Sequence, residues 1–186
     1  MKILLASQSP RRKELLTALG YQFNTVKIDC EEIYPESLPV TEIPAYLAEL
    51  KANAYPDLQQ DEILITADTI VVQDNEVLGK PKGEKEAAEM LKKLSGKTHQ
   101  VITAVRISST EKYFIQTDIA EVEMEDISDE EIDLYIRNFK PLDKAGAYGI
   151  QEWMGMAKIK NINGSFYTIM GLPTHIVYRS LLDFKL

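Results

Sequence analysis

The pattern of apolar and polar positions along the chain predicts strands and helices that follow one another in turn. Short runs rich in Ile, Leu, Val and Thr predict strands at 3–6, 63–72, 99–108, 113–124 and 157–162. Apolar residues three and four positions apart predict helices at 10–19, 41–55, 84–94, 129–140 and 173–184. Some neighbouring strands are too close in sequence for a crossover helix between them. The pattern therefore predicts an α/β fold with a mixed β-sheet flanked by helices.

Capping residues support several of these helix ends. Ser9 and Pro10 are suited to the N-cap and the first helical position of the first helix. Ser128 with Glu131 three residues later is the pattern of a capping box, and Pro141 ends the helix that follows. These signals fix the predicted helix boundaries more closely than periodicity does.

Composition and charge limit the classes of partner. The chain has 186 residues, of which 45% are hydrophobic and 27% charged, the profile of a soluble globular protein. A formal net charge of −8 argues against binding nucleic acid or an anionic membrane, because both attract basic surfaces. A small phosphorylated metabolite remains compatible with this charge if basic groups are gathered locally.

Cysteine and histidine usage points to a reducing compartment. The single cysteine, Cys30, cannot form an intrachain disulfide, so we expect a cytoplasmic protein. The apolar run 3–6 is too short for a secretion signal, and no stretch approaches the roughly 18 residues that span a bilayer. Cys30 as a nucleophile is a weak alternative, and a zinc site would have only His99 and His175 beside it.

A cluster of cations at the start of the first helix is unusual. Helix N-termini favour acidic residues, yet Arg11, Arg12 and Lys13 occupy this first turn, after Ser7 and Ser9. Guanidinium groups, hydroxyls and helix-start amides together make a phosphate receptor. The alternative is a solvated basic turn paired with some of the many carboxylates.

Asp68 lies inside the apolar run 63–72, where an ionised carboxylate needs a cation, a metal or an opening into a cleft. Beside a metal-bound phosphate it would hold the ion and take a proton from attacking water. The alternative is an aspartate bonded to backbone at a strand end. Glu31, Glu32 and Glu121 offer further carboxylates, although such residues are usually surface groups.

Three lysines and a glycine-rich loop are further candidates. Lys51, Lys80 and Lys144 would each neutralise a polyphosphate, or would each be an ordinary surface lysine. In the loop 143–151, small residues allow close backbone approach, and the amide of Gln151 is suited to read a base edge. The bare pattern is equally that of a glycine loop. No P-loop, GxGxxG, HExxH or GxSxG motif is present.

Taken together, these segments resemble the Maf family of nucleotide pyrophosphatases, in order and along essentially the whole chain. The resemblance rests on the blocks Leu4-Leu5-Ala6-Ser7-Gln8-Ser9-Pro10-Arg11-Arg12-Lys13-Glu14-Leu15-Leu16, Ala67-Asp68-Thr69-Ile70-Val71, Gly79-Lys80-Pro81, Leu94-Ser95-Gly96-Lys97-Thr98-His99, Asp143-Lys144-Ala145-Gly146-Ala147-Tyr148-Gly149-Ile150-Gln151 and Gly171-Leu172-Pro173. It implies one domain, 1–186, with two lobes around a central cleft, similar to inosine triphosphate pyrophosphatase-like folds. It also implies a homodimer and a metal-dependent cut between the α and β phosphates, with Mg²⁺ or Mn²⁺.

The resemblance assigns Asp68 as the catalytic base, and Arg12, Thr69 and Gln151 as specificity positions. Its Gly-Ala-Tyr-Gly-Ile-Gln form looks like the branch that acts on dTTP and UTP. We hypothesise that Glu32 shares the metal with Asp68. The residues expected to hold the rest of the substrate are Ser7, Arg11, Arg12, Lys51, Lys80 and Lys144.

Two departures and two alternatives remain. After Gln151 the family usually continues with glycine, whereas this chain has Glu152 and Trp153, and Trp153 either lines the base pocket or packs between lobes. Relatives often show Asp-Glu at the Glu31-Glu32 pair, so only Glu32 is carried forward. One alternative is a pyrophosphatase for 7-methyl-GTP or CTP. The other is a nucleotide-binding regulator of cell division and septum formation.

Overall fold

The computed structural model describes residues 1–184, and its strands and helices interleave along the chain. The strands are β1 (Lys2–Leu5), β2 (Phe23–Thr25), β3 (Glu62–Gln73), β4 (Glu76–Leu78), β5 (Thr98–Ser108), β6 (Tyr113–Met124) and β7 (Ile159–Asn163). The α-helices are α1 (Pro10–Ala18), α2 (Ile43–Asn53), α3 (Glu84–Leu94), α4 (Asp129–Phe139), α5 (Trp153–Lys158), α6 (Phe166–Ile169) and α7 (Thr174–Asp183). Short 3₁₀ helices are η1 (Val40–Glu42), η2 (Pro141–Asp143) and η3 (Ala145–Ala147).

The sheet is mixed, as predicted. Its strand order is β2-β1-β3-β5-β6-β7, with β4 beside β3. β1 runs parallel to both β2 and β3, whereas the β3–β4 and β6–β7 pairs are antiparallel. Contacts divide the chain into two compact units. Unit 1 contains Met1–Thr69, Thr103–Asp118 and the segment from Gly171 onward, and unit 2 contains Ile70–Ile102 and Ile119–Met170.

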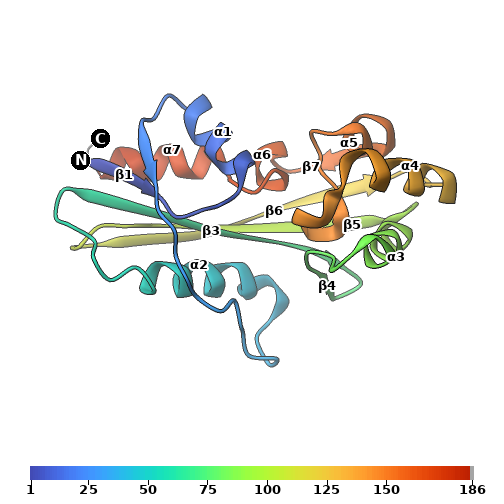
Figure 1. Cartoon of the computed structure of the whole chain (residues 1–186). Helices are drawn as coiled ribbons and strands as arrows, with labels where there is room; N and C mark the ends of the chain where they lie inside the picture. The colour runs from blue at the N-terminus through green and yellow to red at the C-terminus, as the bar shows by residue number, and fades with distance from the viewer. Residues whose placement is uncertain (185–186) are drawn as a thin grey trace. The chain divides into compact units, whose positions relative to one another are not determined.

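In unit 1, α2 covers one face of the sheet, and α1 and α7 lie on the other face (Figure 1). Leu4 of β1 is opposite Leu64 of β3 in the parallel register, and both are buried in a small core with Ala52 of α2. The Thr66 hydroxyl donates a 2.7 Å hydrogen bond to the Ala48 carbonyl oxygen. This bond fixes α2 against β3 where the two elements carry candidate site residues.

In unit 2, α3 packs against α4 over a core of buried aliphatic and aromatic side chains. The predicted capping box is confirmed, because the Ser128 hydroxyl accepts from the Glu131 N–H and the Glu131 carboxylate accepts from the Ser128 N–H. The helix ends at Lys140, whose φ of 45° lies in the left-handed region, directly before Pro141.

The prediction was wrong at several short elements. The strand predicted at 157–162 begins only at Ile159, because Ala157 and Lys158 belong to α5. Thr41 lies in η1, and α2 begins at Ile43. The strands β2 and β4 and the helices α5 and α6 were not predicted. Each spans six residues or fewer and shows too few repeats of its period to be recognised, whereas the equally short β1 and β7 were recognised by their apolar residues.

None of the helices within residues 1–184 is both long and apolar enough to cross a membrane.

Candidate active site

Asp68 is the centre of a cluster of charges in unit 1. It lies within β3, and only 7% of it is exposed. Lys51 of α2 points at it and donates a 2.6 Å hydrogen bond from Nζ to Asp68 Oδ1. Asp68 is therefore a buried acid within an apolar strand, as predicted, and its charge is paired with the partly buried ammonium of Lys51.

Lys51 also contacts a second carboxylate. Its Nζ is 3.1 Å from Oε1 of Glu32, which is half exposed and lies in the irregular segment between β2 and η1. One ammonium group thus lies within ion-pair distance of two carboxylates. The sequence separation of these three residues is large, so only the fold brings them together.

The surroundings of Asp68 shift its acidity. Burial raises the pKa of Asp68 above its ordinary value, the Lys51 and Arg12 charges oppose that rise, and Glu32 adds to it. A carboxylate with a raised pKa is a stronger base than an exposed aspartate. This is the direction that a general base acting near neutral pH requires.

Arg12 is held by three hydrogen bonds within unit 1. Its Nε donates to the Gly171 carbonyl oxygen at 2.7 Å, its Nη2 to the Thr69 hydroxyl at 3.0 Å, and its Nη1 to the Ser7 hydroxyl at 3.3 Å. Thr69 is itself 2.9 Å from Thr103 between hydroxyl oxygens. Three of the predicted substrate-binding residues, Ser7, Arg12 and Thr69, are therefore in direct contact.

The glycine at 171 permits this arrangement. Its φ of +100° is one that L side chains rarely adopt, and an added Cβ would lie 3.2 Å from Thr69 Oγ1. Its carbonyl oxygen fixes Arg12 from a segment far away in sequence. No local pattern near Arg12 could have indicated this partner.

The first turn of α1 is capped differently from the prediction. Ser9 occupies the N-cap position as predicted, but its side chain makes no capping hydrogen bond. Instead the Ser7 hydroxyl accepts from the Ser9 N–H at 3.2 Å. Arg11 is partly buried in α1.

Cys30 lacks the signature of an activated nucleophile. Burial raises the pKa of its thiol, with Lys51 opposing the shift and Glu32 adding to it. A reactive cysteine needs its pKa lowered. The alternative of cysteine chemistry therefore gains no support from the structure.

The three remaining predicted residues belong to unit 2. Lys80 is exposed in the loop after β4, and Gln151 is exposed in the turn before α5. Lys144, by contrast, is only 7% exposed. Its Nζ lies 2.8 Å from Asp143 Oδ1 and 3.1 Å from Glu152 Oε1. Lys144 is therefore no ordinary surface lysine, because two carboxylates share its charge.

Glu152 was not among the predicted site residues. Besides Lys144, its carboxylate accepts a hydrogen bond from the Tyr135 hydroxyl. The departure from the family's usual glycine was the only sequence signal. The neighbouring Trp153 packs within unit 2, where its ring stacks on Tyr135 with a centroid distance of 6.3 Å. This contact lies within unit 2, so it does not decide between the base pocket and packing between the lobes.

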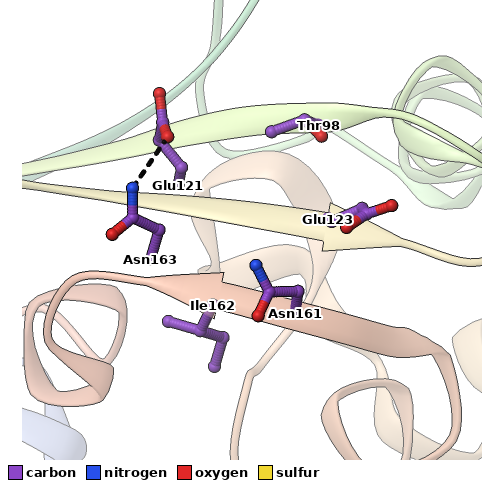
Figure 2. A pocket seen from close by; sticks show the side chains of 6 residues that line it. All are labelled: Thr98, Glu121, Glu123, Asn161, Ile162 and Asn163. Carbon is purple, nitrogen blue, oxygen red and sulfur yellow. Dashed lines mark hydrogen bonds between the residues drawn. The ribbon is translucent and has the colours of Figure 1, made fainter.

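A hollow in unit 2 has the wrong charge for a polyphosphate (Figure 2). It is lined by Thr98, Glu121, Glu123, Asn161, Ile162 and Asn163. The Asn163 side-chain amide donates to Glu121, and Lys160 neutralises Glu123 at 2.8 Å. The negative charge of Glu121 and Glu123 is unfavourable for phosphate groups, and Lys160 is already paired with Glu123. Glu121 is partly buried here and accepts a hydrogen bond from the Asn163 side chain.

His99 is a buried neutral group beside the predicted loop. Its Nε2 is 2.7 Å from the Tyr148 hydroxyl, and its Nδ1 has no hydrogen-bond partner among the described residues. Burial lowers the pKa of His99 from 6.5 to about 4. Protonation of the His99 ring in the folded state would place a positive charge in a buried site that offers it no opposite charge.

This burial predicts a pH dependence of stability. The unfolded chain binds a proton at His99 between about pH 4 and 6.5 while the folded chain does not, so stability falls as the pH is lowered through this window. We expect His99 alone to cost about 2 kcal/mol of unfolding free energy between pH 7 and pH 5. In denaturant unfolding, the loss of unfolding free energy between pH 7 and pH 5 should be smaller in a His99→Gln variant than in the parent by that amount. The control His175→Gln, at a half-exposed site, should behave as the parent. An unchanged difference in His99→Gln would contradict the prediction.

Known proteins share both the fold and the family of this chain. The structure is similar to that of the Ham1 protein from Staphylococcus aureus, with a TM-score of 0.53 and 13% identity over 100% of both chains. That likeness concerns the fold alone, and it confirms the predicted class of mixed sheet flanked by helices. The model of the family described as Maf-like protein matches residues 2–184. The chain belongs to the Maf family.

Relatives agree with this assignment over nearly their whole length. A protein of Phocaeicola vulgatus named dTTP/UTP pyrophosphatase is 50% identical over 97% of this chain and 94% of its own. A protein of Porphyromonas gingivalis with the same name is 49% identical over 98% of this chain and 94% of its own. A protein of Flavobacterium johnsoniae, which also has this name, is 48% identical over 97% of this chain and 93% of its own.

Proposed function

We propose that this protein is a nucleoside triphosphate pyrophosphatase that hydrolyses dTTP and UTP to the monophosphate and pyrophosphate. The relatives described above carry that name at about half identity over almost the full chain. The structural observation that carries the proposal is the buried Asp68, hydrogen-bonded to Lys51. Modified pyrimidine nucleotides would be further substrates in a house-cleaning role.

The chemistry requires a base and positive charge, and unit 1 offers both. A water oxygen forms a bond to the α phosphorus while the bond from that phosphorus to the α–β bridging oxygen breaks. The electron pair leaves with pyrophosphate, and Asp68 takes the proton of the water. Lys51 and Arg12 stabilise the negative charge that develops, and Ser7 and Arg11 help hold the phosphates. No covalent intermediate is needed.

We propose a divalent cation, Mg²⁺ or Mn²⁺, as cofactor. Within residues 1–184 no group of three or more His, Cys, Asp or Glu side chains is arranged to hold a metal. Two carboxylates do converge on one cation, since Glu32 and Asp68 both lie within 3.1 Å of Lys51 Nζ. Magnesium is commonly held by one or two carboxylates together with substrate phosphates, so this pair fits it. A bound ion would supply charge neutralisation for the leaving pyrophosphate.

Base selection is assigned in this proposal to Thr69 and Gln151, with Arg12 fixing Thr69. The Gln151 amide offers a donor and an acceptor, which matches a pyrimidine edge. Lys80 is proposed to contact the phosphates. We further propose a cytoplasmic homodimer, on the basis of the single cysteine and the family resemblance, which light scattering of the purified protein would test.

A panel of triphosphates tests the proposal. Purified protein with Mg²⁺ or Mn²⁺ should release pyrophosphate from dTTP and UTP much faster than from CTP or 7-methyl-GTP. Dominant release of orthophosphate would contradict the position of the cut. Preference for CTP or 7-methyl-GTP would contradict the base assignment. Tight binding without metal-dependent turnover would favour the regulator of cell division.

A further inference from the structure

The turn that carries Gln151 rests on the carboxylate of the next residue, Glu152. Oε1 of Glu152 is 3.1 Å from Lys144 Nζ, and its other oxygen accepts a hydrogen bond from the Tyr135 hydroxyl. The Glu152 N–H donates to the Gly149 carbonyl oxygen at 3.1 Å, which closes the turn. We call Glu152, Lys144 and Tyr135 the Glu152 cluster.

Tyr135 connects the turn to helix α4. It is fully buried, and its hydroxyl accepts a 3.0 Å hydrogen bond from the Gly149 N–H while it donates to Glu152. Its ring stacks on Phe139 and on Trp153, with centroid distances of 5.0 Å and 6.3 Å. The hydroxyl therefore links a rigid helix to both ends of the turn.

The turn is also packed without spare room. A Cβ added at Gly149 would lie 2.7 Å from Glu152 Cδ, and one added at Gly155 would lie 1.7 Å from the Ile150 carbonyl oxygen. Ile150 is 5% exposed, whereas Gln151 is exposed. Buried residues before the exposed amide, and a partly buried, hydrogen-bonded carboxylate after it, determine its direction.

The charges of the cluster argue against a phosphate at Lys144. Asp143 and Glu152 lie 2.8 Å and 3.1 Å from its Nζ, so two carboxylates outweigh one buried ammonium. A phosphate approaching this group would have to compete with two carboxylates for the Lys144 ammonium. Lys144 is better suited to hold Glu152 in place than to bind the substrate.

We propose that Glu152 is a positioning residue for base selection, acting through Lys144 and Tyr135 to fix the turn that presents the Gln151 amide. The inference rests on the proposed function, because it concerns how that same reaction chooses its base. Uracil and cytosine differ at C4, where one offers an acceptor and the other a donor. A fixed amide distinguishes them, and a mobile amide adapts to both.

The test compares UTP with CTP in Glu152→Gln. Glutamine keeps the shape of the side chain but removes the charge that pairs with Lys144. We expect the ratio of kcat/KM for UTP over CTP to fall about tenfold, while kcat for UTP changes less than about threefold. The matched control is Glu123→Gln, which removes an exposed carboxylate paired with Lys160 in the same unit. It should keep the parent ratio.

A second variant and a spectroscopic measurement separate positioning from general stability. Tyr135→Phe removes the hydroxyl that joins Glu152 to Gly149 and keeps the ring packing, so it should show the same loss of discrimination. Trp153 is the single tryptophan, and its emission reports on the turn without any substrate. Both variants should shift its emission maximum or increase its quenching by acrylamide, whereas Glu123→Gln should not.

An unchanged UTP over CTP ratio in folded Glu152→Gln and Tyr135→Phe would overturn the proposal. So would unchanged Trp153 emission in both variants. A parent protein that releases no pyrophosphate from any triphosphate would instead contradict the proposed function. The Trp153 measurement would still decide whether Glu152 fixes the turn.

Discussion

Replacing Asp68 by asparagine is expected to leave the protein folded and to reduce pyrophosphate release about a thousandfold or more. Asparagine has nearly the same shape, and its Oδ1 can still accept the hydrogen bond that Lys51 donates at 2.6 Å. It cannot take a proton from water, and it brings no negative charge to a divalent cation. The measurement is the initial rate with dTTP and UTP at saturating metal, alongside circular dichroism and the melting temperature.

Asp61→Asn is the matched control for this variant. Asp61 is an exposed aspartate of the same unit, paired with Lys2 at 3.1 Å. The Asp61→Asn variant should retain full activity. If folded Asp68→Asn hydrolysed dTTP at a rate near that of the parent, Asp68 would not be the base.

The second large effect is expected at Lys51. Replacing it by methionine leaves Asp68 and Glu32 without the ammonium that lies 2.6 Å and 3.1 Å from their oxygens. Removing one partner of a buried ion pair costs about 3 kcal/mol, so the melting temperature of Lys51→Met should fall. Turnover should fall steeply as well, because the charge near the phosphates is lost.

The same variant tests the proposed metal site without any nucleotide. In the parent, the Lys51 ammonium competes with a divalent cation for both carboxylates. Without it, Mn²⁺ should bind more tightly, so Mn²⁺ should raise the melting temperature of Lys51→Met more than that of the parent. Lys2→Met, which breaks the surface pair with Asp61, is the control and should respond as the parent does. An equal or smaller response in Lys51→Met would argue that Glu32 and Asp68 do not form the cation site.

The long elements were predictable because they show their period several times. The helix 84–94 and the strand 113–124 were predicted with the bounds that α3 and β6 have. The capping box at Ser128 is a local signal that needs no tertiary information. The short elements β2, β4, α5 and α6 repeat their period too few times, and the strand predicted at 157–162 began two residues before β7, where α5 still continues.

The site residues, too, fall into those that the sequence pattern identifies and those that only the fold reveals. Asp68 was recognisable because an acid inside an apolar strand is costly unless it has a partner. That Lys51 is this partner depends on α2 packing on β3, which no local pattern specifies. Glu152 was missed because its partners Tyr135 and Lys144 are reached only through the fold. Sequence therefore identified which side chains were unusual, and structure identified what each of them contacts.

The hydrogen bond from Arg12 to Gly171 has a consequence for how the site is made. The two residues are 159 positions apart, so Arg12 leaves the ribosome long before its carbonyl partner is synthesised. Until then the guanidinium lacks its 2.7 Å partner, and its contacts with Ser7 and Thr69 are not fixed from that side. A nascent chain therefore carries no completed arginine site until Gly171 has been synthesised and has folded back onto Arg12.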